Sequence, residues 1–370
     1  MTKEIVIAGA GVSGLTAAIN LKSAGRAVRV IERSPESGAQ RFPDWDAVEN
    51  WTSPEDLPQF LERIGIDDGQ FRYSGHTSFT VIDPYGRRYD VQTRRPFFYL
   101  IKCGAVPGGL ELGLQTQAKA MGIPITYGVT CQPGEADIWA VGSFGQGATF
   151  VSVGFTFSTD HPDWVCGIVD KNIAPRAYAY LVIVQGEGTL AVLMSKERRD
   201  AHRLLERAIN VYRQHTDLNI REVRRSGGSG GDMAAFWLSE DDFVIGEAAG
   251  FQDFLWGFGI RHAFTSGYLA AQTILTSQQW QVVAEQEIRP LVRASLVNRW
   301  LYDRMPNWGY ALLVRRFARD ADLNALVSRW YHPRRIHRWL WPVVERHFQL
   351  HVSALSSHRR YQNRTRQAAG

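Results

Sequence analysis

The feature that most constrains the fold of this chain is a glycine motif near its N-terminus, Gly9-x-Gly11-x-x-Gly14. A strand predicted over residues 3–8, apolar from Ile5 to Ala8 as is typical of a strand buried on both faces, precedes it, and a helix is predicted over 13–24. In such a unit the first glycine permits a tight turn, the second lets the backbone approach a pyrophosphate, and the third lets helix and strand pack closely. The motif therefore predicts a dinucleotide-binding unit.

The residues around the motif extend this prediction. A second strand is predicted over 26–31 and leads into Glu32, whose carboxylate can accept hydrogen bonds from ribose hydroxyls and whose charge disfavours a 2′-phosphate. The pyrophosphate would lie at the positive end of the helix, near the free N–H groups of Val12 and Ser13. Arg33, directly after the acid, is a further candidate for cofactor contact. The alternative is a tight turn without a ligand and a surface glutamate.

A second glycine-rich region indicates which dinucleotide is bound. Gly246-Glu247-Ala-Ala-Gly-Phe follows a strand predicted over 243–246, and Gly257-Phe258-Gly259-Ile260 opens a helix predicted over 259–276. Here the chain resembles FAD-dependent oxidoreductases of the glutathione-reductase-like fold, and more closely the geranylgeranyl reductase family, which reads Gly-Asp-Ala-Ala-Gly-Phe and then Gly-x-Gly-Ile. The resemblance implies FAD as the cofactor. It also implies that Glu247, one methylene longer than the usual Asp, binds a ribityl hydroxyl, and that the Gly257–Ile260 turn approaches the flavin.

Further positions match the same family more loosely. Gly38-Ala-Gln-Arg41 resembles its Gly-x-x-Arg segment, which implies an FAD contact for Arg41, although Phe42 stands where the family has Cys. Lys102 stands where the family often has Arg, and the resemblance places Cys131 where backbone groups hold adenine. The segment that ends at Gly142 resembles the strand returning to the FAD domain. The resemblance covers about residues 3–275.

The resemblance implies an α/β fold: a Rossmann-like FAD-binding domain, an inserted antiparallel β-sheet substrate domain and a helical C-terminal region. Strands are predicted over 73–83 and 87–92 and repeatedly over 148–194, helices over 107–121 and 195–215, and a flexible link over 225–232. The predicted division assigns 1–72, 96–147 and 240–280 to the FAD-binding domain, 73–95 and 148–239 to the substrate domain, and 281–370 to the helical region.

The expected chemistry rests on the flavin, so the motifs require no catalytic acid or base. The family's Tyr-x-Trp-x-Phe-Pro signature corresponds here to a segment that begins with Tyr178 and has Tyr180 in place of Trp. These two tyrosines and His76 are the candidate catalytic residues; the alternative is that the tyrosines are core aromatics. We expect an FAD-dependent oxidoreductase that reduces or dehydrogenates an apolar substrate. The alternatives are an aromatic monooxygenase, whose Asp-Gly-x-x-Ser-x-x-Arg segment is missing at 141–147, and a flavin-holding protein without catalysis.

Other cofactors and compartments are limited by what the sequence lacks. No second Gly-x-Gly-x-x-Gly marks a nicotinamide domain, so NAD(P)H is expected only as a transient electron donor. Three widely spaced cysteines without a C-x-x-C pair indicate neither a disulfide framework nor a dithiol centre, and the ten histidines show no metal-binding spacing. No metal is therefore expected. The cysteine usage and the absence of a signal peptide or long apolar run favour a cytoplasmic protein.

Charge is divided unevenly along the chain. Residues 289–370 hold sixteen arginines, no lysine, four acids and five of the twelve tryptophans, a net charge of +12 within a total of +5. One interpretation is an interfacial surface that gives peripheral membrane contact; the alternative is a helical domain with its tryptophans inside and its arginines in solvent. Nucleic-acid binding is not expected, because no recognised module is present. The sequence leaves the oligomeric state open.

Overall fold

A computed structural model describes residues 3–132, 134–143, 148–195, 200–238 and 243–349. Its N-terminal layer is a parallel four-stranded sheet in the order β8-β2-β1-β9, with strands Ile125–Tyr127, Val28–Glu32, Ile5–Ala8 and Ile138–Trp139. The β1 residues are buried on both faces, which explains their continuous apolar sequence. A single parallel bridge between Trp139 and Val244 adds the returning chain beyond β9.

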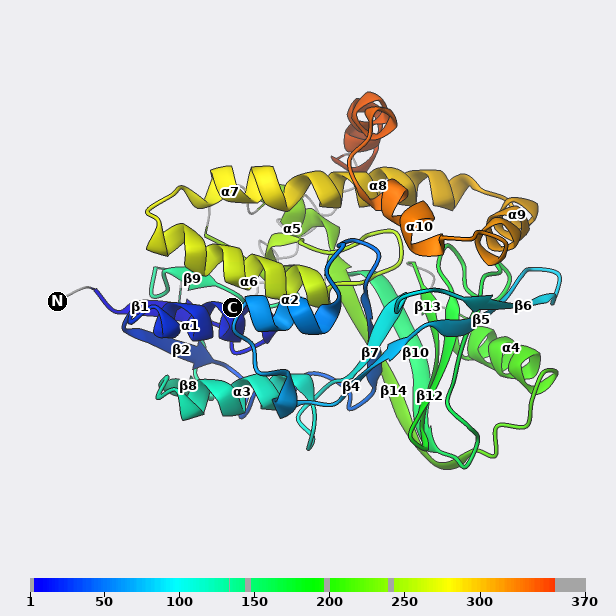
Figure 1. The fold of residues 1–370 in the computed structure, drawn as a ribbon, viewed down its shortest axis with the longest axis horizontal. Coiled ribbons are helices and arrows are strands. Elements are labelled where there is room, and N and C mark those ends of the chain that lie inside the picture. The colour runs from blue at the N-terminus through cyan, green and yellow to red at the C-terminus, as the bar shows by residue number, and fades with distance from the viewer. Residues whose placement is uncertain (1–2, 133, 144–147, 196–199, 239–242, 350–370) are drawn as a thin grey trace, which may run out of the picture.

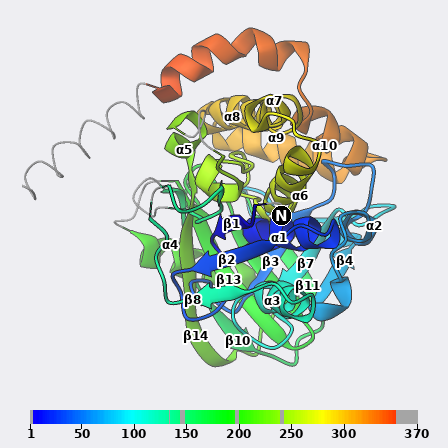
Figure 2. The same ribbon diagram turned by 90° about the vertical axis from the view of Figure 1, so that its left-hand side faces the viewer.

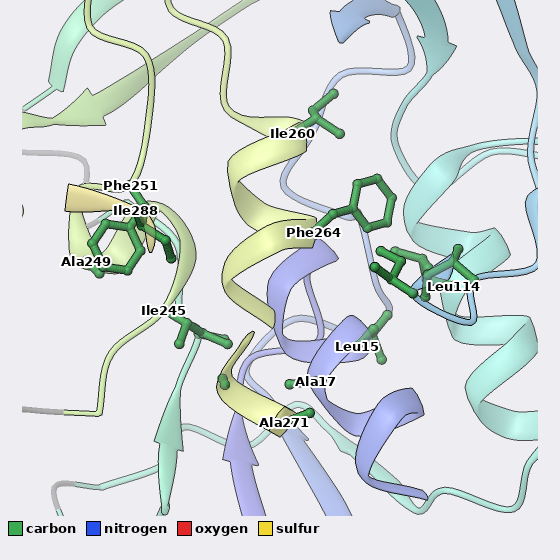
Figure 3. Close-up of a cluster of buried hydrophobic side chains, with 14 of the residues drawn as sticks. Leu15, Ala17, Leu114, Ile245, Ala249, Phe251, Ile260, Phe264, Ala271 and Ile288 are labelled. Carbon is green, nitrogen blue, oxygen red and sulfur yellow. The ribbon is translucent and has the colours of Figure 1, made fainter. Parts of the chain in front are cut away.

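Helix α1 (Val12–Ser23) packs against two helices that come from distant parts of the chain, α3 (Leu110–Ala120) and α6 (Ile260–Leu275). Figure 3 shows the buried side chains at this junction, among them Leu15 of α1, Leu114 of α3 and Phe264 of α6. The core beside the parallel sheet therefore forms only when residues near the N-terminus pack against residues beyond 245.

Two further sheets lie beside this layer (Figure 1). The smaller is antiparallel, in the order β3-β7-β4, with strands Trp45–Glu49, Phe98–Lys102 and Tyr73–His76. The larger has seven strands in the order β14-β10-β13-β12-β11-β5-β6, and these are Arg221–Asp232, Ala148–Ser158, Glu187–Met194, Ala179–Val184, Trp164–Ile168, Ser78–Ile82 and Arg88–Gln92. All its pairings are antiparallel except β11 with β5.

The two faces of the seven-stranded sheet bury different side chains. Leu181 and Ile183 of β12 face the cluster that contains Tyr212 of α4 (Ala201–Arg213). Tyr180 and Val182, which alternate with them, face a second cluster that we call the aromatic layer. Its buried members come from the seven-stranded sheet, the small sheet, adjoining loops and helix α10 (Leu323–Tyr331): Trp45, Trp51, Val91, Phe97, Phe98, Leu100, Val182, Val184, Leu323, Val327 and Tyr331.

The C-terminal region is helical, as expected, and covers one side of the molecule (Figures 1 and 2). The remaining elements outside the sheets are α2 (Leu57–Arg63), η1 (Asp68–Gln70), α5 (Met233–Leu238), η2 (Gly246–Ala249), α7 (Trp280–Glu287), α8 (Arg289–Arg304), α9 (Asn307–Ala318), α10 (Leu323–Tyr331) and a last helix over residues 335–349. Among the described helices, none has both the length and the apolar content needed to cross a bilayer.

The architecture confirms the predicted fold class, and three local predictions were wrong. The expected flexible link at 225–232 is part of strand β14, whose backbone pairs with β10. The strand expected over 243–246 is reduced to the bridge at Val244 and then becomes the 3-10 turn η2. Residues 73–76 pair with β7 in the small sheet instead of continuing into β5. The predicted domain ranges stay a prediction, and residues 350–370 lie outside the described residues.

Candidate FAD site

The glycine turn between β1 and α1 has the geometry that its sequence predicts. Gly9 has φ +105°, and a Cβ there would lie 2.2 Å from the carbonyl oxygen of Ala140. A Cβ on Gly14 would lie 2.0 Å from the Gly9 oxygen, so neither position accepts a side chain. Gly11 differs, because a Cβ built there meets no protein atom within 4 Å. The turn is closed at two glycines and open at the third, and a pyrophosphate fits at that opening.

Helix α1 presents its N-terminus to the same opening. Gly11 is its N-cap and provides no side chain to satisfy the first backbone N–H groups, which include those of Val12 and Ser13. The positive end of the helix dipole and these free donors favour an anion such as phosphate. The chemistry of the turn therefore suits the diphosphate of a dinucleotide.

Glu32 lies at the end of β2 with both carboxylate oxygens held by the backbone. Oε2 accepts a 2.7 Å hydrogen bond from the Ala10 N–H, and Oε1 accepts one of 2.8 Å from the Ser34 N–H. These bonds fix the carboxylate next to the glycine turn and leave lone pairs for ribose hydroxyls. The neighbouring Arg33 is exposed. The Val129 N–H donates to the Glu32 carbonyl oxygen, so the segment leading to Cys131 runs beside this acid.

The second glycine-rich region forms two consecutive turns before α6. Gly246 has φ +65°, and a Cβ there would lie 2.5 Å from Ser13 Oγ, so the two motifs touch. Gly257 has φ +87° and precedes Phe258, and Gly259 is the N-cap of α6. Neither of the two glycines is tightly enclosed by protein atoms, since the nearest contacts of an added Cβ begin at 3.5 and 3.9 Å. Ile260, the last residue of the motif, is the first residue of α6 and is buried.

Glu247 points away from η2 toward the seven-stranded sheet. One of its carboxylate oxygens accepts a 2.6 Å hydrogen bond from the Gly231 N–H of β14, and burial raises its pKa. A Cβ on Gly230 would lie 2.9 Å from the same oxygen, so the glycines of β14 provide the space for this carboxylate. Contact of the second oxygen with a ribityl hydroxyl stays a prediction.

The other predicted cofactor contacts lie in different surroundings. Arg41 forms ion pairs with Asp46 and, at 3.5 Å, with Glu111. Lys102 bonds to Glu187 and to the Pro43 carbonyl oxygen. Both cations are thus already paired with carboxylates from neighbouring elements, and their contact with FAD stays a prediction.

Gly142 lies just after β9, on the segment that closes the first glycine turn. The Ala140 N–H bonds to the Ala8 oxygen at 2.7 Å, which brings this segment against Gly9. Gly142 has φ +71°, and an added Cβ meets nothing within 4 Å. The structure therefore brings Gly142 to the same side of the sheet as the first motif.

The candidate catalytic residues separate into two locations. The Tyr178 hydroxyl donates a 2.9 Å hydrogen bond to the Trp256 carbonyl oxygen, next to Gly257, and the Tyr178 and Tyr180 rings are 6.0 Å apart. Burial raises the pKa of both phenols. His76 lies on β4, where it stacks on Phe98, and burial lowers its pKa. Tyr178 and Tyr180 thus lie near the second glycine turn, whereas His76 lies in the small sheet.

Sequence reasoning missed three buried acids near these turns. Asp253 accepts hydrogen bonds from the Leu255 and Trp256 N–H groups and from the Tyr331 hydroxyl, and burial raises its pKa to about 6. Asp44 accepts a 3.0 Å bond from Ser226 Oγ. Burial raises the pKa of Asp44 to about 7.

The third acid, Glu49, has no hydrogen-bond partner for either carboxylate oxygen among the described residues, and it is 1% exposed. Burial raises its pKa to about 7, against the lowering effect of Arg261. Trp45, Ala47 and Glu49 alternate along β3, and the first two belong to the aromatic layer or pack against it. The Glu49 side chain therefore lies on the face of β3 that also carries Trp45 and Ala47.

Comparisons with known proteins agree with this geometry. Residues 4–42, which hold the first glycine motif, Glu32 and Arg41, match the sequence profile of the family described as FAD binding domain. The curated protein sequences contain no significant match. The FAD expected from the motifs is therefore supported by both the turn and the matched segment.

Three solved structures share the fold at low sequence identity. A geranylgeranyl bacteriochlorophyll reductase-like protein from Thermoplasma acidophilum aligns with TM-score 0.67 and 16% identity, covering 91% of this chain and 98% of that one. The flavin-dependent brominase Bmp2 aligns with TM-score 0.60 and 14% identity over 93% and 100%. A 2-methyl-3-hydroxypyridine-5-carboxylic acid oxygenase variant aligns with TM-score 0.51 and 17% identity over 86% and 97%. The matched segment supports an FAD-binding function for the N-terminal motif, and the fold is the one that these solved structures share.

Proposed function

We propose that this chain is an FAD-dependent oxidoreductase that reduces or dehydrogenates an apolar substrate by hydride transfer through the flavin. The observation that carries the proposal is the contact between the second glycine turn and the aromatic layer. The Phe258 ring lies 5.2 Å from Trp51, whose ring is 4.4 Å from Phe97 and 5.5 Å from Tyr331. A substrate that approaches this turn from the aromatic layer meets apolar and aromatic surfaces, which favours a lipophilic molecule.

The residues present fit FAD at each part of the cofactor. Gly11 and the α1 N-terminus would hold the diphosphate, Glu32 a ribose, Glu247 the ribityl chain, and the Gly257–Gly259 turn the ring. The flavin would supply the hydride chemistry when bound. A reduced nicotinamide is the electron donor we propose. It would visit transiently, because a second dinucleotide motif is missing from the sequence.

Glu49 is the proton source that we assign to the reaction. Its carboxyl is buried without a hydrogen bond among the described residues, on the face of β3 shared with Trp45. A carboxylic acid in such surroundings holds its proton to a higher pH than an exposed one and can deliver it to a substrate carbon that becomes electron-rich. Tyr178, directly before β12, and Tyr180 on β12 are proposed as positioning residues.

The first test is cofactor content followed by anaerobic turnover. We expect purified protein to carry the visible absorption of a flavin, or to acquire it with added FAD. A panel of lipophilic alkenes and their saturated counterparts should then reoxidise or reduce the flavin without oxygen. A colourless protein that takes up no FAD would overturn the proposal.

A second candidate function, aromatic monooxygenation, is supported by the likeness to the oxygenase structure. It predicts oxygen consumption that depends on both NAD(P)H and substrate, with no anaerobic turnover. The third, a flavin-holding protein without catalysis, predicts FAD binding with no reaction toward any donor or acceptor. The same oxygen-electrode and anaerobic experiments separate all three.

A further inference from the structure

The helix over residues 335–349 has two apolar faces, and one of them packs against the rest of the protein. On this inner face Val344 and Phe348 are buried in the main core, and the Trp341 ring lies 6.4 Å from that of Phe236. His337 Nε2 lies 3.2 Å from the Asn298 side-chain oxygen on α8. The helix is therefore held in place by its inner face, and its orientation is fixed.

The outer face of the same helix exposes large apolar side chains. Ile336 is 44% exposed, Trp339 78% and Val343 57%. Their spacing of three and four residues places them in one stripe along the helix. In Figures 1 and 2 this orange-red helix lies at the outer edge of the molecule, beyond α8. Three exposed apolar side chains in one stripe, one of them a tryptophan, mark an interaction surface.

Arginines accompany the outer stripe. Arg334, Arg335, Arg338 and Arg346 are exposed, and none forms an ion pair within the part of the chain that the structure describes. Glu345 is the sole acid between residues 332 and 349. Trp330, Arg334, Arg335 and Ile336 also line a shallow surface hollow, which joins the end of α10 to the stripe. The face thus combines an apolar stripe with an uncompensated positive charge.

We propose that this outer face docks on an anionic membrane surface. The arginines would bind lipid phosphates, while Trp339 would lie at the headgroup boundary with Ile336 and Val343 inserted beside it. Branched aliphatic side chains favour lipid over nucleic acid, because a single-stranded nucleic acid is bound by aromatic platforms on which bases stack. The inference rests on the helix alone and is independent of the chemistry proposed for the flavin.

The test is flotation of the full-length protein with vesicles. Vesicles of phosphatidylcholine with one third phosphatidylglycerol should carry the protein, and pure phosphatidylcholine vesicles should not. The double variant W339S/V343S and the triple variant R334Q/R335Q/R338Q should each lower the apparent affinity at least about tenfold, and added salt should weaken wild-type binding. All these positions are exposed, so thermal unfolding midpoints should stay close to that of wild type.

The matched controls are V223S and R224Q, which change an exposed valine and an exposed arginine on β14. They should float like wild type. Equal flotation of the helix variants and wild type would overturn the proposal, and so would failure to float with anionic vesicles. Binding of a single-stranded or duplex oligonucleotide without vesicle binding would also overturn it, in favour of a nucleic-acid surface.

Discussion

Glu49 shows how the surroundings of a single carboxyl determine its effect on stability. Burial raises its pKa from the ordinary 4.5 to about 7, so the native state holds its proton in a pH range where the unfolded chain has released it. The stabilisation that this group contributes is fully present below about pH 4.5. It is lost as the pH rises toward about 7, because ionisation leaves a buried charge.

The variant E49Q keeps the shape of the side chain and removes the ionisation. We expect the free energy of unfolding of E49Q relative to wild type to rise by about 3 kcal/mol between pH 4.5 and pH 7.5. Urea unfolding at a series of pH values measures this difference. The exposed Glu62 provides the control, since E62Q should leave the pH dependence unchanged. Parallel wild-type and E49Q curves would contradict the assignment.

Gly11 and Gly14 belong to one motif but have opposite surroundings. We expect G11V to abolish FAD binding while the apoprotein unfolds within about 0.5 kcal/mol of wild type, because its side chain enters open space at an ordinary β-region backbone conformation. G14V should lower stability by about 1–3 kcal/mol, because its Cβ overlaps the Gly9 oxygen. Flavin titration and thermal unfolding of the apoproteins separate the two effects. Full FAD affinity in G11V would show that the opening does not receive the diphosphate.

The crossing of α1 and α6 depends on close approach at the element scale. A Cβ on Gly267 would lie 2.3 Å from the Ser13 carbonyl oxygen and 2.9 Å from Thr16 Cβ. We expect G267L to separate the helices, to destabilise the protein by about 1–3 kcal/mol and to weaken FAD binding. The exposed T276L at the end of α6 is the matched control. Unchanged unfolding of G267L would contradict the packing described here.

Strand β14 marks where local sequence fails to predict an element. Its run of serine and glycine from Ser226 to Gly231 carries no strand-type side chains, so it resembled a link. The strand forms because β10 offers a partner edge along most of its length, and Gly227, whose Cβ would lie 2.6 Å from the Ser152 oxygen, permits the approach. β14 pairs with residues 148–158, which lie far away in the sequence. Local propensity measures side-chain preference alone and therefore cannot predict this pairing.

At the scale of the whole molecule, the sequence predicted the parts whose chemistry is local. Both glycine motifs, their helices and Glu32 were located because turn geometry requires particular residues at fixed spacing. The surroundings of Glu49 depend on α6, which packs against β3 and whose Arg261 donates to the Glu49 carbonyl oxygen. The ion pair of Arg41 with Glu111 depends on α3 lying beside the 38–41 loop. These contacts join distant segments, so residue spacing could not reveal them.

The split between the two halves of the FAD site has a consequence for how the chain folds. Gly9 to Gly14 leave the ribosome before η2 and α6, which complete the core around α1 and follow more than 230 residues later. Contacts of such high sequence separation form slowly. During synthesis the apolar face of α1 therefore lacks its native partner α6 until residue 275 has emerged. A fragment that ends at residue 238 should bind no FAD and should aggregate, whereas its complementation by residues 239–370 should restore a soluble flavoprotein.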